Sequence, residues 1–163
     1  MLPNPPTKYG VALFSGFQAL DVFGPLDALN ILSASTPLNL SILSTTLSPV
    51  STIPIKDPVP GFIGQRIVPT HTYQDAPKDI EVLLVPGGEG TRDAELTQPV
   101  WVRHARWVHD GNIWTSSGVS AGIDMIYAFI ADQYGQEVAE SVATTSEYSR
   151  NPDSMNDPFS GLA

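Results

Sequence analysis

Cysteine is absent from this 163-residue sequence. The absence excludes disulfides, thiolate metal sites and a cysteine nucleophile, and it leaves the redox compartment open. Charge is also scarce, because only 15% of the residues are charged. Eight basic residues stand against 17 acidic ones, which gives a formal net charge of −9. This balance disfavours nucleic acid and anionic membranes as partners.

Long apolar runs are missing as well. No stretch of 18 or more apolar residues occurs, so we expect no membrane span. The first six residues lack the basic region and the apolar core of a signal peptide. Hydrophobic residues make up 42% of the chain, enough for a buried core, and the length suits one domain. We therefore expect a soluble cytoplasmic protein.

The most informative stretch is a short apolar run, Val82 to Val85, that stops at Pro86-Gly87-Gly88. A run without polar alternation favours a strand buried on both faces of a parallel sheet, and Pro86 ends it. Gly87 and Gly88 allow positive φ and a close approach of ligand or backbone. Backbone N–H groups exposed after such a strand would stabilise a developing negative charge. The alternative is a tight turn with no further role.

The remaining elements follow from apolar periodicity and turn residues. Strands are predicted at residues 9–15 and 38–44, a hairpin or sheet edge at 50–55 with 65–70, and a helical turn at 93–100. A second hairpin is predicted at 103–116 around Asp110-Gly111, followed by a helical pattern at 119–146 that Gly135 divides. This order predicts an α/β fold with a mainly parallel sheet.

Asp21 lies at or just before the start of a predicted helix, with Pro25 placed in the first helical turn. The simpler interpretation is a solvated carboxylate that the helix dipole stabilises. However, its neighbours Leu20 and Val22 are apolar, which indicates partial burial. A buried carboxylate has a raised pKa and is suited to general-acid work. Asp21 is therefore a candidate acid or base.

Residues 118–122, Gly-Val-Ser-Ala-Gly, match the G-x-S-x-G pattern of serine hydrolases in a predicted strand-to-helix connection. All three histidines, His71, His104 and His109, precede Ser120, whereas the α/β-hydrolase order places the histidine after the serine. We therefore interpret Ser120 as a residue near the N-cap of a closely packed helix. Other triad orders exist, so the hydrolase alternative stays open.

His104 and His109, with Asp110, are candidate metal ligands. Their five-residue spacing across a predicted strand and turn places the two rings on opposite faces, so we interpret them as surface residues. We expect no metal and no cofactor. The tryptophans are interpreted as core and interface anchors rather than a nucleic-acid stacking site: Trp101, Trp107 and Trp114.

Three blocks of the sequence resemble the ThiJ/PfpI superfamily, and its isonitrile-hydratase-like branch in particular. The blocks are residues 11–25, 83–92 and 105–124, and they follow the family order over most of 9–148. The resemblance implies a class I glutamine amidotransferase-like fold, a flavodoxin-like three-layer sandwich. It also implies a lyase that adds water to a small carbon–nitrogen substrate. Asp21 matches the family's acid, and Gly87 and Gly88 match the loop whose backbone lines the pocket.

One part of the family pattern has no counterpart. In the family a strand leads to a sharp elbow with a nucleophilic Cys, usually followed by Thr-Gly, and the acid contacts that Cys. Here residues 96–100 run almost directly into Trp101. About one βα unit is thus absent near 93–101, since such a crossover needs about a dozen residues or more. Ser116, Ser117 and Ser120 lie in the later block and do not replace the Cys.

Three explanations remain open: a shortened pseudoenzyme, a domain completed by a partner, or a defective gene model that skips a segment. We divide the chain into an N-terminal tail (1–8), a single ThiJ/PfpI-like domain (9–148) and a C-terminal tail (149–163). Within that tail we expect residues 151–163 to be loose. The lost unit would uncover apolar faces on residues 82–85 and on the helix at 123–130. We therefore expect a homodimer or other self-association.

The functional hypothesis is a ThiJ/PfpI-type protein that resembles isonitrile hydratases but lacks the thiolate its chemistry needs. A non-catalytic binding or interaction module of the same fold is the alternative that we favour for this chain. A serine hydrolase using Ser120 is the third hypothesis. In each case the expected ligand is a small molecule.

Overall fold

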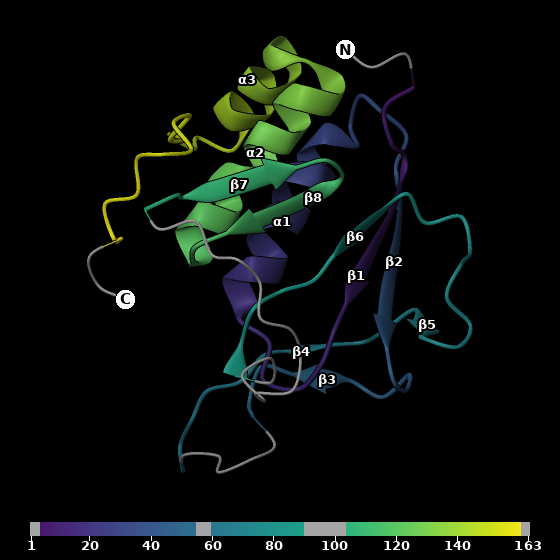
Figure 1. Ribbon diagram of the computed structural model, residues 1–163. Coiled ribbons are helices and arrows are strands. Elements are labelled where there is room, and N and C mark those ends of the chain that lie inside the picture. Colours follow the sequence, from purple (N-terminus) through teal and green to yellow (C-terminus); the bar gives the residue numbers. More distant parts are fainter. Residues whose placement is uncertain (1–3, 55–59, 90–103, 161–163) are drawn as a thin grey trace. The chain divides into compact units, whose positions relative to one another are not determined.

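The computed structural model describes residues 4–54, 60–89 and 104–160 (Figure 1). The chain divides into two compact units, which we describe separately. The sheet unit comprises Pro6–Val22 and Pro37–Thr97, and the helical unit comprises Phe23–Thr36, Gln98–Ala163 and the first five residues. The predicted helical turn at 93–100 and Trp101 lie outside the described residues.

The sheet unit contains a four-stranded parallel sheet with the strand order β5-β2-β1-β6. Its strands are β1 (Lys8–Ala12), β2 (Asn39–Ser44), β5 (His71–Thr72) and β6 (Val82–Leu84). In Figure 1, β2, β1 and β6 lie side by side in that order. The predicted α/β fold with a mainly parallel sheet is confirmed.

β1 is one of the two interior strands of this sheet, together with β2. It pairs with β2 on one side, where Lys8 faces Asn39, and with β6 on the other, where Tyr9 faces Val82. The buried side chains of the unit include Tyr9, Val11, Leu13, Phe17 and Leu43, all at most 5% exposed. Burial of one such side chain stabilises a fold by about 1.5–3 kcal/mol.

β6 differs from its prediction. The run at 82–85 was expected to be a strand buried on both faces, but β6 ends the sheet and pairs only with β1 among the described strands. Leu83 is 54% exposed and Val85 is 63% exposed. The apolar run does form a strand, as predicted. Its burial depends on neighbouring strands, however, and the two interior positions belong to β1 and β2.

A two-stranded antiparallel pair completes the sheet unit. β3 (Val50–Ser51) pairs with β4 (Arg66–Ile67), and Val50 faces Ile67. The hairpin or sheet edge predicted for residues 50–55 and 65–70 is therefore confirmed, in a shorter form.

The helical unit contains an antiparallel hairpin and two consecutive helices. β7 (Trp107–Asp110) pairs with β8 (Ile113–Ser116), which confirms the predicted hairpin. The two connecting residues are Gly111, with a φ of 62°, and Asn112, one position later than the predicted Asp110-Gly111 turn. α2 (Val119–Tyr134) and α3 (Gln136–Thr145) are separated at Gly135, as predicted. Figure 1 shows the hairpin beside α2. Trp107 is buried, as expected for a core anchor.

α1 (Ala19–Leu32) begins in the sheet unit and ends in the helical unit. The prediction that Pro25 occupies its first turn is wrong, because the helix already begins at Ala19 and encloses Pro25. Further along, α1 packs closely on α2. A Cβ atom on Gly24 would lie only 2.7 Å from Cγ1 of Ile123, so this contact requires a residue without a side chain.

Two further predictions for the helical unit are wrong. The α2 face at 123–130 was expected to be uncovered, yet Ile126 and Ile130 are at most 3% exposed. Residues 151–163 were expected to form a loose tail. Instead, the described part is tied to α2 by a bond from the Asn151 N–H to Asp124 Oδ1 at 2.9 Å, and the Arg106 N–H donates to the Ser154 carbonyl at 2.7 Å.

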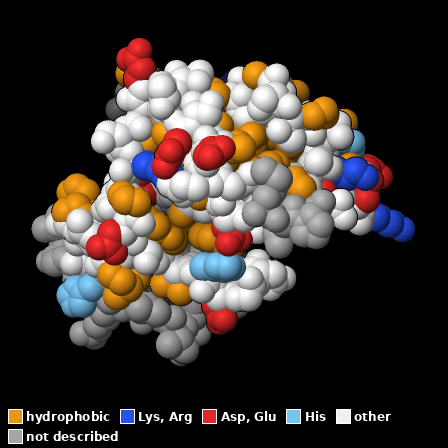
Figure 2. All heavy atoms as spheres, turned by 90° about the horizontal axis from the view of Figure 1, so that it is seen from above, with side chains coloured by type: hydrophobic (Ala, Val, Ile, Leu, Met, Phe, Trp, Pro, Cys, Tyr) orange, Lys and Arg blue, Asp and Glu red, His pale blue; other side chains and the backbone are white. Residues whose placement is uncertain are grey.

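The surface agrees with the acidic composition. On the face drawn in Figure 2, acidic side chains are scattered among uncharged ones, and apolar side chains lie exposed between them. Within the described ranges, no helix has the length and apolar character needed to cross a bilayer.

Candidate functional site

Asp21 lies in the first turn of α1, at the end of a connection that starts where β1 stops. Its chain neighbours differ in environment: Val22 is buried, whereas Leu20 is 50% exposed. Asp21 itself is partly buried, as the apolar flanks indicated. The helix therefore brings a carboxylate to the edge of the core without removing it fully from water.

The two carboxylate oxygens of Asp21 have different surroundings. Oδ2 accepts a hydrogen bond from the Gly87 N–H at 2.9 Å, whereas Oδ1 is buried with no hydrogen-bond partner among the described residues. Burial raises the pKa of Asp21 above its ordinary value, and the Gly87 bond opposes this increase. The net effect is a raised pKa, and the acid or base role of Asp21 stays a prediction.

Gly87 and Gly88 join the loop after β6 to the loop after β1. The Gln18 N–H donates to the Gly87 carbonyl at 2.8 Å, and the Glu89 N–H donates to the Gly16 carbonyl at 3.0 Å. Between them, Phe17 and Gly88 form an isolated antiparallel bridge. The two loops are therefore held together by backbone hydrogen bonds.

This contact explains the need for glycine. Gly88 has a φ of 144°, and a Cβ there would lie 2.3 Å from the Gly16 carbonyl oxygen. A Cβ on Gly87 would lie 2.8 Å from Asp21 Oδ2. The Gly87 N–H is already bonded to Asp21, so in this structure it stabilises the protein's own carboxylate. Roles of Gly87 and Gly88 toward a ligand remain predictions.

The location of this cluster is chemically informative. Asp21 and Gly87 follow the carboxyl ends of β1 and β6, two adjacent parallel strands. Open α/β sheets bind their ligands at the carboxyl ends of the strands. We therefore take Asp21, Gly87 and Gly88 as the candidate site.

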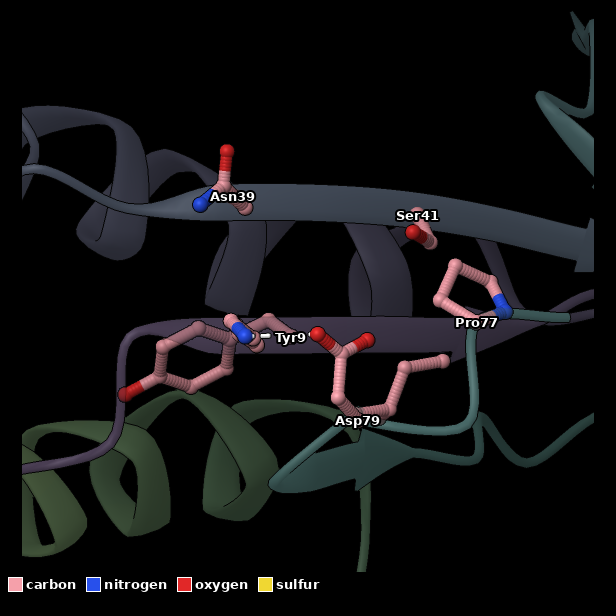
Figure 3. Close-up of a pocket in the computed structure, with 7 residues that line it drawn as sticks. Tyr9, Asn39, Ser41, Pro77 and Asp79 are labelled. Carbon is pink, nitrogen blue, oxygen red and sulfur yellow. Dashed lines mark hydrogen bonds and ion pairs between the residues drawn. The ribbon is translucent and has the colours of Figure 1, made fainter.

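A cavity of about 180 Å³ lies at the opposite end of the sheet (Figure 3). In Figure 3 its lining comes from the starts of β1 and β2, with Tyr9 and Asn39, and from the segment before β6, with Pro77 and Asp79. Lys8 pairs with Asp79 at 2.5 Å, and both side chains are exposed, so solvent screens the pair. The cavity and the candidate acid therefore do not coincide.

The described contacts of the histidines do not involve Asp21, Gly87 or Gly88. His71 Nδ1 bonds to the Thr70 hydroxyl, and His109 stacks on Trp114 with ring centroids 3.9 Å apart. His104 is exposed, with a φ of 68°. Within the described ranges, no three His, Cys, Asp or Glu side chains are grouped as ligands for a metal ion.

Ser120 lies near the N-cap of α2, as predicted, two residues after the N-cap Gly118. In this first turn its Oγ accepts a hydrogen bond from Arg106 Nη2 at 3.2 Å. A nucleophilic serine needs a base that accepts its proton, and a guanidinium only donates. This environment argues against the hydrolase hypothesis.

The sequence interpretation missed a buried ionic network in the helical unit. Arg106 pairs with Asp124 through Nη2 at 2.6 Å and Nε at 2.7 Å, and both side chains are almost fully buried. The Tyr148 hydroxyl donates to Asp124 Oδ1 at 3.0 Å. Burial, with this bond, raises the pKa of Tyr148 to about 12. The sequence did contain a signal for this network. Asp124 lies on the apolar side of the predicted helix, between Ile123 and Ile126, and a buried aspartate nearly always has a charged or polar partner.

The comparisons with known proteins agree on the fold. No protein-family model matches the chain. It is 25% identical to an isonitrile hydratase from Pseudomonas putida over 196 residues, covering 89% of this chain and 80% of that protein. It is similar to the structure of a ThiJ/PfpI family protein from Pseudomonas syringae, with a TM-score of 0.70 and 23% identity over 90% of this chain and 77% of that one. Drosophila melanogaster DJ-1beta gives a TM-score of 0.68 at 15% identity, over 88% and 99%.

The chain has the ThiJ/PfpI fold.

The resemblance stated from the sequence is thereby confirmed, and with it the flavodoxin-like α/β class. The match to the isonitrile hydratase runs over 196 residues, which exceeds the 163 residues of the whole chain. That relative therefore contains residues inside the matched region that have no counterpart here. Since this ThiJ/PfpI-fold chain has no cysteine at all, no thiol is available beside Asp21.

Proposed function

We propose that this ThiJ/PfpI-fold protein binds a small carbon–nitrogen compound beside Asp21 and does not hydrate it. The observation that carries the proposal is the Asp21 carboxyl group, held by Gly87 at the carboxyl ends of the strands in a chain without cysteine. An acid and a glycine loop position a ligand, but a thiolate nucleophile is needed for covalent chemistry. The protein is thus a pseudoenzyme of the isonitrile-hydratase-like branch.

The ligand class follows from the acid. In its protonated form Asp21 donates one hydrogen bond, and its other oxygen is already bonded to Gly87. A partner with an acceptor atom, such as a formamide oxygen, suits this arrangement better than an ammonium group. The similarity to the isonitrile hydratase supports the same substrate class.

The test uses the purified protein with an alkyl isonitrile and with the corresponding N-alkylformamide. We expect no formamide product, and we expect calorimetric binding of the formamide that Asp21→Asn weakens. Asp27→Asn is the matched control, because Asp27 is an exposed carboxylate on the same helix. Turnover that disappears in Asp21→Asn would show a thiol-independent hydratase instead. Equal binding by both variants would remove Asp21 from the site.

A hydratase remains the second candidate, because the longer relative contains residues that this chain lacks. The encoding DNA distinguishes the two. An in-frame segment between the codons for Gly90 and Trp101 that encodes a Cys-Thr-Gly elbow would restore the nucleophile and favour the enzyme. An uninterrupted coding sequence supports the shortened protein.

A further inference from the structure

Three segments of the helical unit converge at the start of α2. Arg106 comes from the residue before β7, Ser117 precedes the N-cap of α2, and Asp157 comes from the C-terminal segment. Arg106 is 5% exposed, and the side chain of Asp157 is 6% exposed. A cationic group and an anionic group are therefore both withdrawn from water at this point.

One of the three guanidinium nitrogens of Arg106 has no hydrogen bond. Its Nε and Nη2 atoms are bonded to Asp124, and Nη2 also reaches Ser120. Its Nη1 atom is buried without a hydrogen-bond partner and lies 3.6 Å from Asp157 Oδ1, beyond hydrogen-bond distance. The guanidinium thus directs an unused donor at the Asp157 carboxylate.

The other oxygen of Asp157 is held from the helix start. Oδ2 accepts a hydrogen bond from the Ser117 hydroxyl at 2.9 Å. α2 has 16 residues, and its N-cap Gly118 supplies no side-chain bond to the first turn. The N-terminus of such a helix attracts negative charge through its dipole and its unpaired N–H groups. A guanidinium and a hydroxyl therefore lie beside one carboxylate, and the hydroxyl belongs to the residue just before the N-cap of α2.

We propose that this arrangement is a binding site for small carboxylates, occupied in this structure by the chain's own Asp157. The ligand would accept from Ser117 and from Arg106 Nη1, the two groups that face Asp157. A singly charged ligand fits better than a phosphate dianion, because Asp124 already contacts the same guanidinium and would repel a second charge. The inference does not depend on the proposed function.

The C-terminal segment is held in a way that permits exchange. Its described hydrogen bonds to the rest of the unit come from Asn151, Ser154 and Asp157. Its large apolar side chains Met155 and Phe159 are 61% and 57% exposed. Little apolar burial therefore opposes release, and a carboxylate that replaces Asp157 would loosen residues 151–160.

The test is chemical rescue of a variant with the site vacated. Asp157→Ala removes the internal carboxylate, and the melting temperature is measured in sodium acetate and in sodium chloride at equal ionic strength. We expect acetate to raise the melting temperature of the variant by about 2–4 °C, as saturation of a weak site does. Asp153→Ala is the matched control, since that carboxylate lies in the same segment but accepts from the Met155 N–H. An equal acetate effect on both variants would overturn the proposal.

A second measurement uses the wild-type protein, so the test does not depend on the variant folding. Excess formate should compete with Asp157 and increase amide hydrogen exchange over residues 151–160, relative to chloride at the same ionic strength. Exchange in α3 should stay unchanged. Unchanged exchange over 151–160 at molar formate would contradict the proposal.

Discussion

Gly87 donates its backbone N–H to Oδ2 of Asp21 at 2.9 Å, and a side chain on Gly87 would begin 2.8 Å from that same oxygen. The loop after β6 therefore stabilises the ionised carboxylate of Asp21 and also limits the space beside it. The two residues are 66 positions apart in the sequence, and the pairing of β1 with β6 brings their loops together.

The burial of Asp21 makes the stability of the protein depend on pH in a defined direction, and the Gly87 bond opposes that effect. Burial raises the pKa of Asp21, so the folded state holds its proton more tightly than the unfolded state. The stabilising contribution is complete below the unfolded pKa of about 3.9 and is lost as pH rises through the higher folded pKa.

Asp21→Asn should abolish this loss of stability with rising pH. We expect the free energy of unfolding of the variant, relative to wild type, to increase as pH rises from about 4 through the folded pKa. Urea unfolding at a series of pH values measures it, with Asp27→Asn as the control for loss of one carboxylate. A difference that stays constant with pH, or that decreases, would remove Asp21 as a buried acid.

Gly88→Ala should destabilise the protein more than a glycine substitution in open space. At Gly88 the unfavourable φ and the clash with the Gly16 carbonyl act together, so we expect a loss of about 3 kcal/mol or more. Gly111→Ala is the control, since Gly111 also has positive φ but a Cβ there meets nothing within 4 Å. We expect about 1 kcal/mol for the control. Equal losses of unfolding free energy for the two variants, measured by chemical denaturation, would show that the loops after β1 and β6 separate easily.

Ser120→Ala should leave any esterase activity unchanged. The variant loses one hydrogen bond from Arg106, so we expect at most about 1 kcal/mol of destabilisation. Hydrolysis of an activated ester and a thermal melt on the same sample measure both. Complete loss of esterase activity with the fold intact would favour the serine-hydrolase hypothesis.

Self-association is expected through the exposed edge of the sheet unit. Leu83 and Val85 lie exposed on and just after β6, whose only described neighbour is β1. We expect light scattering to detect dimers or larger species at micromolar concentration, and Leu83→Lys to reduce them. Leu47→Lys is the control, because Leu47 is 56% exposed in a loop of the same unit. A wild-type monomer with a sharp cooperative melt would contradict this prediction.

The sequence predicted local structure well where the signal was local. The hairpin at 103–116, the break at Gly135 and the strand predicted at 38–44 depend on neighbouring residues, and each is present. The hairpin loop is Gly111-Asn112, one residue later than predicted, and the strand covers Asn39–Ser44. Local patterns singled out Asp21 and the Gly87-Gly88 pair separately. Only the resemblance assigned them to one site, because no local pattern relates residue 21 to residue 87. Asp21, Gly87 and Gly88 come together only because β1 pairs with β6.

The failures involve burial and distant partners. The apolar run at 82–85 was expected to be interior, yet its exposure is set by strand order rather than by composition. The segment at 151–160 was expected to be loose because it is polar. Its polar groups instead bond to Asp124 and Arg106, which lie at least 27 residues earlier in the chain. Pairing across such a separation leaves no periodic signal.

Pro25 has a consequence for the acid that precedes it by one helical turn. A proline has no N–H, so it cannot donate the i to i−4 hydrogen bond that the Asp21 carbonyl would receive in a regular helix. The ladder of α1 is thereby interrupted at the residue that carries the candidate chemistry. The first turn of α1 consequently depends more on its contacts with Gln18 and Gly87 than on the helix behind it. We expect this turn to open together with the glycine loop, on a faster timescale than the rest of α1.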